Sequence, residues 1–260
     1  MNRIKTIIAT VAAIIISTLP GYAIKFQKET LDYEVVYHWG IIWKHAANAT
    51  LSISPEGQIY NTKLTAATRS WADKFYPVRD TLTCAIKRDG FLPLKYTKIM
   101  HEDGDYGLDI VEYEYTPDSI YGHCSRIYRK KPECKISLSS TGVTLDMMSA
   151  FYYLRTIDYG CMNHGEKITT SIFSGKRKEV FTIEYRGIEN IKLRDKSTYD
   201  AHKVVCTFAQ PGKKKTSDDI VAWFSLDDKS IPLMVKSRLP IGEFRVYYKA
   251  EDSVLNKNRK

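Results

Sequence analysis

Apolar and polar residues alternate along most of this chain, and that alternation limits the folds it can adopt. Between residues 33 and 248, large apolar side chains repeatedly lie two positions apart. A period of two puts them on one face of an extended strand, as in antiparallel sheets that cover a core with one face. The apolar sets are Tyr33, Val35 and Tyr37; Leu82, Cys84 and Ile86; Val111, Tyr113 and Tyr115; Phe181, Ile183 and Tyr185; Val204, Cys206 and Phe208; Phe224 and Leu226; and Phe244, Val246 and Tyr248.

Turn signals separate these segments at hairpin spacing. Asp-Gly pairs supply the positive φ angles that a tight hairpin turn needs, and clusters of Pro, Gly and Asp have the same effect. No alternation of strands and helices interrupts the pattern, so the sequence predicts an all-β fold: a long antiparallel meander forming a highly curved sheet or a partly open barrel. The turn signals are Pro55-Glu56-Gly57, Asp89-Gly90, Asp103-Gly104, Thr116-Pro117-Asp118 and Asp227-Asp228-Lys229.

One segment departs from this rhythm and predicts a single helix over about 144–157. Its apolar residues recur at positions i, i+4 and i+7, which form one row on a helix. Asp146 or Thr144 can cap the first turn by accepting bonds from its free backbone amides. We expect this helix to pack on the concave face of the sheet through the row Met147, Phe151 and Leu154.

The first 23 residues have the organisation of a secretory signal peptide. Arg3 and Lys5 precede an apolar core, and a turn with a small residue, Ala23, follows it. We therefore expect cleavage after Ala23 and a periplasmic or secreted product. The domains expected are a signal peptide (1–23), a single β-rich domain (24–253) and a basic tail (254–260). No later apolar run is long enough for a transmembrane helix.

The charge favours anionic partners. The formal net charge is +9, but the basic residues are spread along the chain rather than gathered in one stripe. For an exported protein this pattern argues against nucleic acid as a partner. It leaves lipids, glycolipids and glycans as candidate ligands.

The cysteines permit disulfides in an oxidising compartment without defining them. Cys124 and Cys134 flank a predicted hairpin, but its turn near Lys130-Lys131-Pro132 is centred about two positions past their midpoint. A bridge between them is permitted and not favoured, so the pairing stays open. The five cysteines are Cys84, Cys124, Cys134, Cys161 and Cys206.

Catalytic and metal-binding templates are missing from the sequence. There is no G-x-S-x-G elbow, no H-E-x-x-H helix and no phosphate-binding loop, and the histidines are scattered singly. Gly212 to Thr216 is better interpreted as a basic hairpin tip. We therefore expect no catalytic residue, metal or cofactor, with Ser149, His164 and an acid as the remaining hydrolase alternative.

The helix carries one set of candidate ligand-binding residues. Asp146 and Arg155 lie on opposite faces of a helix and cannot pair. Arg155 therefore needs either an internal carboxylate such as Asp80 or Glu184, or an anionic ligand in a cleft. In the second case Met148 and Tyr152, on the adjoining row, would form part of the wall.

A second candidate set lies in the aromatic and charged segment Trp71 to Asp80. Tyr76 and Arg79 there combine a ring that can stack on a sugar or amphiphile with a guanidinium that can orient an anion. Ordinary packing at the rim of a sheet explains the same residues.

The segment from Asp146 to Arg155 also resembles a known helix. Asp146, Ser149, Tyr152 and Arg155 are similar to the D-x-x-S-x-x-Y-x-x-R pattern of an exported bacterial family known as a domain of unknown function. The resemblance spans roughly Leu31 to Tyr248, although Lys44-His45-Ala46-Ala47 stands where the family has glycine. Further matches, in the same order, are Leu31-Asp32-Tyr33, Trp39-Gly40-Ile41, Phe75 to Asp80, Trp223 to Asp227, Ile231-Pro232 and the strand around Gly242.

The resemblance implies a periplasmic β-rich fold without an assigned reaction. A weaker resemblance links the chain to curled-sheet lipoprotein carriers. We expect an exported cell-envelope protein that binds a hydrophobic or glycan-containing anionic ligand without catalysis. Met148 and Tyr152 would bury its apolar part, while Arg155 or Arg79, with Tyr76, would orient its head. The alternatives are an envelope hydrolase and an assembly module that contacts another envelope protein.

Overall fold

The computed structural model describes residues 26–129, 131–212, 219–238 and 242–250. The predicted signal peptide, the basic tail and most of the basic tip lie outside these residues. The strands are β1 (Glu29–Trp39), β2 (Ile42–Glu56), β3 (Ile59–Thr68), β4 (Arg79–Lys87), β5 (Leu92–Glu102), β6 (Asp105–Tyr115), β7 (Ile120–Tyr128), β8 (Cys134–Ser140), β9 (Thr144–Leu145), β10 (Lys167–Phe173), β11 (Lys178–Lys192), β12 (Thr198–Ala209), β13 (Ile220–Ser225), β14 (Pro232–Arg238) and β15 (Glu243–Tyr248). The helices are α1 (Ser70–Asp73), η1 (Asp89–Phe91), α2 (Met147–Leu154) and η2 (Tyr159–Cys161).

All fifteen strands form one sheet, in the order β8-β7-β6-β5-β4-β3-β2-β1-β15-β14-β13-β12-β11-β10-β9. Neighbouring strands are antiparallel except β9 and β10, which are parallel. The chain therefore runs as two meanders that meet where β1 pairs with β15, with Tyr33 opposite Tyr248. Four of the five turn signals lie between two successive strands, as predicted, and the fifth, Pro55-Glu56-Gly57, overlaps the end of β2 at its turn into β3.

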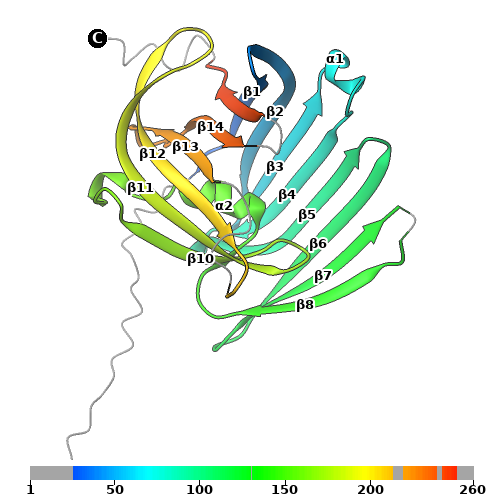
Figure 1. Ribbon diagram of the computed structural model, residues 1–260. Coiled ribbons are helices and arrows are strands. Elements are labelled where there is room, and N and C mark those ends of the chain that lie inside the picture. Colours follow the sequence, from blue (N-terminus) through cyan, green and yellow to red (C-terminus); the bar gives the residue numbers. More distant parts are fainter. Residues whose placement is uncertain (1–25, 130, 213–218, 239–241, 251–260) are drawn as a thin grey trace, which may run out of the picture.

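The sheet curls until its two edges approach each other. Figure 1 shows the half containing β2 to β8 and the half containing β10 to β14 on either side of α2. Ser140 Oγ at the end of β8 donates to Ser171 Oγ of β10 at 2.9 Å. Nearby, the ring of Phe173 lies over Gly122 of β7. The predicted fold class is thus confirmed as a nearly closed, barrel-like sheet with one main helix inside its curve.

Helix α2 is shorter than the predicted 144–157 at both ends. It begins later because residues 144 and 145 form strand β9, and it ends at Leu154, after which the amides of Arg155 and Thr156 bond three residues back in a turn. Asp146 then caps the helix, as expected. Its Oδ1 accepts from Met148 N at 2.7 Å and Ser149 N at 2.9 Å, and Ser149 Oγ accepts from Asp146 N at 2.8 Å. This reciprocal capping box satisfies amides that would otherwise be buried without partners.

The helix packs against both halves of the barrel. Met148 and Tyr152 belong to a buried cluster with residues from strands of both halves, and Ala150 and Leu154 belong to a second cluster with residues of β9 to β13. No helix in the described ranges is long and apolar enough to cross a membrane.

All five cysteines are unpaired thiols. Across the β7–β8 hairpin, Cys124 lies opposite Ile136, while Cys134 lies opposite Arg126. The two cysteines are therefore offset along the ladder, which is the mismatch between turn and spacing that the sequence indicated.

Candidate functional site

Arg155, the first predicted ligand-binding residue, already has an internal partner. It follows the last turn of α2 and is only 1% exposed. Its Nη1 donates to Glu29 Oε2 at 2.6 Å and its Nη2 to Glu29 Oε1 at 3.2 Å, while Lys229 O accepts from Nε at 3.2 Å and from Nη2 at 2.9 Å. The partner is Glu29 rather than the expected Asp80 or Glu184. Sequence reasoning missed Glu29 because it lies 126 residues away in the chain.

Met148 and Tyr152 also lie in the core rather than on an open wall. Both side chains are fully buried, and Tyr152 packs edge-on against Phe26 with ring centroids 5.3 Å apart. Burial raises the pKa of Tyr152 well above its usual value. Neither side chain lines either of the two cavities described below.

Arg79 and Tyr76 lie at the rim of the sheet, each with a partner. Arg79 forms a bidentate pair with Asp73, with Nη1–Oδ1 at 2.9 Å and Nη2–Oδ2 at 2.8 Å. Hydrogen bonds from Arg79 and Thr68 lower the pKa of Asp73 to about 2. Tyr76 Oη donates to Glu102 Oε2 at 2.9 Å.

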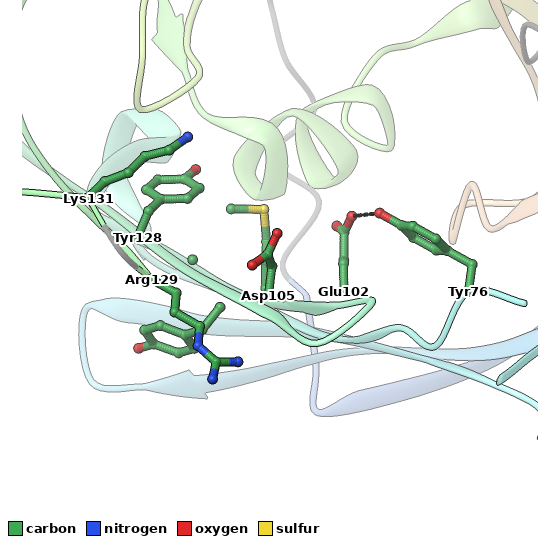
Figure 2. Close-up of a pocket in the computed structure, with 9 residues that line it drawn as sticks. Tyr76, Glu102, Asp105, Tyr128, Arg129 and Lys131 are labelled. Atoms are coloured by element: carbon green, nitrogen blue, oxygen red, sulfur yellow. Dashed lines mark hydrogen bonds between the residues drawn. The ribbon is translucent and has the colours of Figure 1, made fainter. Parts of the chain in front are cut away.

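The rim also forms a polar pocket of about 280 Å³ at the β5–β6 turn and the end of β7. Figure 2 shows Glu102, Asp105 and Tyr128 rising from the same side of the sheet, with Tyr76 bonded to Glu102. Phenol rings beside carboxylates and cations suit a hydroxyl-rich ligand such as a sugar. The lining residues are Tyr76, Met100, Glu102, Asp105, Tyr106, Gly107, Tyr128, Arg129 and Lys131.

A largely buried charge pair holds Tyr128, one of the residues that line this pocket. Asp109 is buried, and its two oxygens accept from Arg126 Nε at 2.8 Å and from Tyr128 Oη at 2.9 Å. Burial raises the pKa of Asp80, and the nearby Glu102 carboxylate raises it further. Tyr76 is the only one of the five predicted site residues that the structure brings to this pocket.

A second cavity, which we name the barrel cavity, has a volume of about 200 Å³ and lies between α2 and the sheet. None of its lining residues is charged, and only Tyr33 and Cys206 carry a polar side-chain atom. Burial raises the pKa of the Cys206 thiol to about 12. The lining residues are Tyr33, Val35, Ala49, Leu51, Leu64, Met147, Ala150, Phe151, Leu154, Phe181, Cys206, Phe208, Ile220, Ala222, Phe224, Pro232, Val235, Phe244 and Val246.

Helix α2 faces the barrel cavity with the row Met147, Ala150, Phe151 and Leu154. This row contains the apolar stripe found in the sequence, while Met148 and Tyr152 point to the packed side. Both rows are apolar, so helical periodicity alone does not distinguish a cavity wall from a filled core.

Tyr33 lines the barrel cavity, but its hydroxyl is fully buried and makes no hydrogen bond to the described residues. Arg155, Tyr152 and Glu29 act electrostatically on this hydroxyl, and none of these three residues lines the cavity. A buried polar group without a partner lowers the stability of the folded protein.

The structure does not favour Ser149 as the nucleophile of the hydrolase alternative. Ser149 is fully buried, and its hydroxyl bonds to the backbone of Asp146 within the capping box. In the described ranges, no group of three or more His, Cys, Asp and Glu side chains is placed to hold a metal ion.

Comparison with known proteins assigns the chain to a family. The family model described as "Protein of unknown function (DUF3108)" matches residues 32–249. The chain belongs to the DUF3108 family. The crystal structure of a beta-barrel-like protein of domain of unknown function DUF1849 from Brucella abortus resembles this DUF3108 protein, with a TM-score of 0.61 and 11% identity over 86% of this chain and 96% of that one. At that identity the likeness shows the fold alone, and no curated protein matches the chain.

Proposed function

We propose that this DUF3108 protein is a non-catalytic binding protein that holds the apolar chain of a lipid-like ligand in the barrel cavity. The observation that carries the proposal is a cavity between helix and sheet whose lining contains no charged residue. Burying apolar surface there stabilises a complex by about 25 cal/mol per Å² of ligand surface removed from water. The sequence resemblance to curled-sheet lipoprotein carriers agrees with such a ligand.

The apolar lining defines the ligand class. None of the residues around the barrel cavity is charged, so the cavity suits a hydrocarbon or acyl chain rather than an ionic group or a sugar. A polar head would have to remain outside this lining. We therefore favour a lipid with a single apolar chain in the cavity.

Arg155 and Arg79 have no part in this proposal, because Glu29 and Asp73 already neutralise them. A glycan in the polar pocket is a second candidate, favoured by the rings of Tyr76, Tyr106 and Tyr128 around carboxylates and cations. In this second proposal Tyr76 remains a ligand-binding residue.

We further propose that the protein is exported and works in the cell envelope as one domain (residues 24–253). The charged start, apolar core and Ala23 of the first 23 residues support export. Protein sequencing of the exported product tests it: the mature chain should begin at Ile24.

The cavity proposal is tested by filling the space. Ala49 lines the barrel cavity on β2, whereas Ala67 of β3 points to the opposite face, because its neighbour Ala66 is the residue paired with Ala49. Ala49→Phe should lower affinity for a fluorescent fatty-acid probe at least about tenfold, while the matched control Ala67→Phe should bind like the unmodified protein.

Two results would count against the cavity as the binding site. One is unchanged probe binding by Ala49→Phe, and the other is no binding by the unmodified protein. Mass spectrometry of molecules that co-purify from the native compartment identifies the ligand, and recovery of the probe chemically altered would favour the hydrolase alternative.

A further inference from the structure

Two adjoining loops at one end of the barrel expose large apolar side chains to solvent. Ile41, in the turn between β1 and β2, is 98% exposed, and Trp39 beside it is 56% exposed. Phe75, which follows α1 in the connection between β3 and β4, is 78% exposed. We name this surface the aromatic tip: Trp39, Ile41, Trp43, Trp71, Phe75 and Tyr76.

Several contacts join the two loops into one surface. Trp71 Nε1 donates to His45 O at 2.7 Å, and the ammonium of Lys44 lies 4.1 Å from the centre of the Trp71 ring. The backbone amide of Arg69 also donates to Ala46 O at 2.8 Å. In Figure 1 α1 and the adjoining ends of β1 and β2 lie at the same end of the barrel.

The β1–β2 turn is held in shape without burying its apolar residues. The rings of His38 and Trp43 stack with centroids 3.7 Å apart, and His38 Nε2 lies 2.8 Å from Gly40 O. The guanidinium of Arg245 lies over the Trp43 ring, 4.5 Å from its centroid. These contacts stabilise the β1–β2 hairpin while Trp39 and Ile41 remain exposed.

Exposed cations lie around the tryptophan part of the aromatic tip: Lys44, Arg69 and Lys74. Two carboxylates at this end are paired, Asp73 with Arg79, and Glu243 with Lys236 and Arg245. Other carboxylates, Glu102, Asp103 and Asp80, act on Tyr76 at the edge of the tip.

We propose that the aromatic tip docks on the surface of an anionic phospholipid membrane. Trp and Tyr favour the headgroup layer because their rings are apolar and their polar atoms remain hydrated, while Ile and Phe enter the acyl boundary. Lysine and arginine beside them are attracted to anionic headgroups. An exposed apolar surface with polar residues around it is typical of an interaction site. This proposal does not depend on what occupies the barrel cavity.

Vesicle binding by the purified protein tests the proposal. Vesicles of phosphatidylcholine with phosphatidylglycerol should bind the protein, and vesicles of phosphatidylcholine alone should bind it much more weakly. Three of the four tryptophans, Trp39, Trp43 and Trp71, belong to the aromatic tip, so binding should shift the fluorescence to the blue.

Substitutions of exposed residues separate docking from folding. Ile41→Ser and Phe75→Ser should each lower the partition coefficient about tenfold. Lys74→Gln should lower binding to the anionic vesicles about fivefold, with a smaller effect in high salt. The matched control is Ile188→Ser on β11, which removes a side chain that is 60% exposed outside the aromatic tip and should change nothing.

Three outcomes would overturn the proposal. The first is no preference of the unmodified protein for anionic vesicles, and the second is equal loss of binding in Ile188→Ser and Ile41→Ser. The third is concentration-dependent self-association that Ile41→Ser abolishes, because the tip would then be an interface between two copies of the chain.

Discussion

At the scale of single residues, Arg155 connects the end of α2 to the start of β1. Its guanidinium is held by Glu29 and by the carbonyl of Lys229, and the rings of Phe26 and Tyr152 lie within 5.6 Å of it. We therefore expect Arg155 to contribute to the stability of the barrel rather than to ligand binding.

Arg155→Ala should therefore lower the free energy of unfolding by about 3 kcal/mol, because it leaves a partly buried carboxylate without its partner. Denaturant unfolding followed by circular dichroism measures the change. Arg155→Lys keeps the charge but not the bidentate geometry, so its free energy of unfolding should lie between those of the unmodified protein and Arg155→Ala. A stable Arg155→Ala protein with weaker ligand binding would instead identify a ligand anchor.

Tyr33→Phe should have the opposite effect on the free protein. Removing a buried hydroxyl that has no partner among the described residues should raise the free energy of unfolding by about 1 kcal/mol. The matched control is Tyr115→Phe, which loses a hydrogen bond to Pro93 O and should be less stable. A loss of stability in Tyr33→Phe would argue against an unsatisfied donor.

The Arg79–Asp73 pair predicts a dependence on acid pH. Because the folded-state pKa of Asp73 is lowered from 3.8 to about 2, its contribution to stability is present above about pH 4 and is lost as the pH falls towards 2. Arg79→Ala should return the pKa towards 3.8, measured by NMR titration of the Asp73 carboxyl. An unchanged pKa would assign the shift to the Thr68 hydroxyl instead.

At the scale of elements, one glycine allows a close approach between the two halves of the barrel. A Cβ atom on Gly122 of β7 would lie 2.8 Å from Cε2 of Phe173, which is fully buried at the end of β10. The two strands come from opposite halves of the sheet, and the contact requires the absence of a side chain on β7.

Gly122→Ala should lower the free energy of unfolding by about 1–3 kcal/mol through overpacking against this ring. Combining it with Phe173→Leu should recover part of the loss, since the smaller side chain leaves room for the methyl group. Thermal unfolding of the two single variants and the double variant measures the coupling. Strictly additive effects would mean that the two residues do not touch.

Local elements were predictable because their determinants lie close together in sequence. The Asp-Gly turns at 89–90 and 103–104 and the Asp146 cap depend on residues a few positions apart. The helix limits were predicted less well: Thr144 and Leu145 pair with Ser171 and Ile172, and that pairing outweighs continuation of the helix.

At the scale of the whole molecule, the curl of the sheet decides which side chains water can reach. Cys84, Cys124 and Cys206 come from both halves and are buried, whereas Cys134 and Cys161 are exposed. Burial also raises the pKa of Cys124 to about 11. The thiolate is the reactive form, so burial and a raised pKa both lower the reactivity of a cysteine.

Thiol labelling at neutral pH should therefore modify Cys134 and Cys161 first and the other three only after unfolding. Peptide mapping by mass spectrometry after short exposure to a water-soluble maleimide measures the order. Rapid labelling of Cys84 and Cys206 in the folded protein would mean that the halves separate in solution.

The sequence alone determined the all-β class, the turns, the presence of one main helix and its cap, because alternation, turn residues and capping act over a few positions. Tertiary structure decided the contacts between distant segments: the pairing of β1 with β15, Glu29 as the partner of Arg155, and the row of α2 that faces the barrel cavity. These depend on how far the sheet curls, which is a sum of small twists over fifteen strands and has no local signal in the chain.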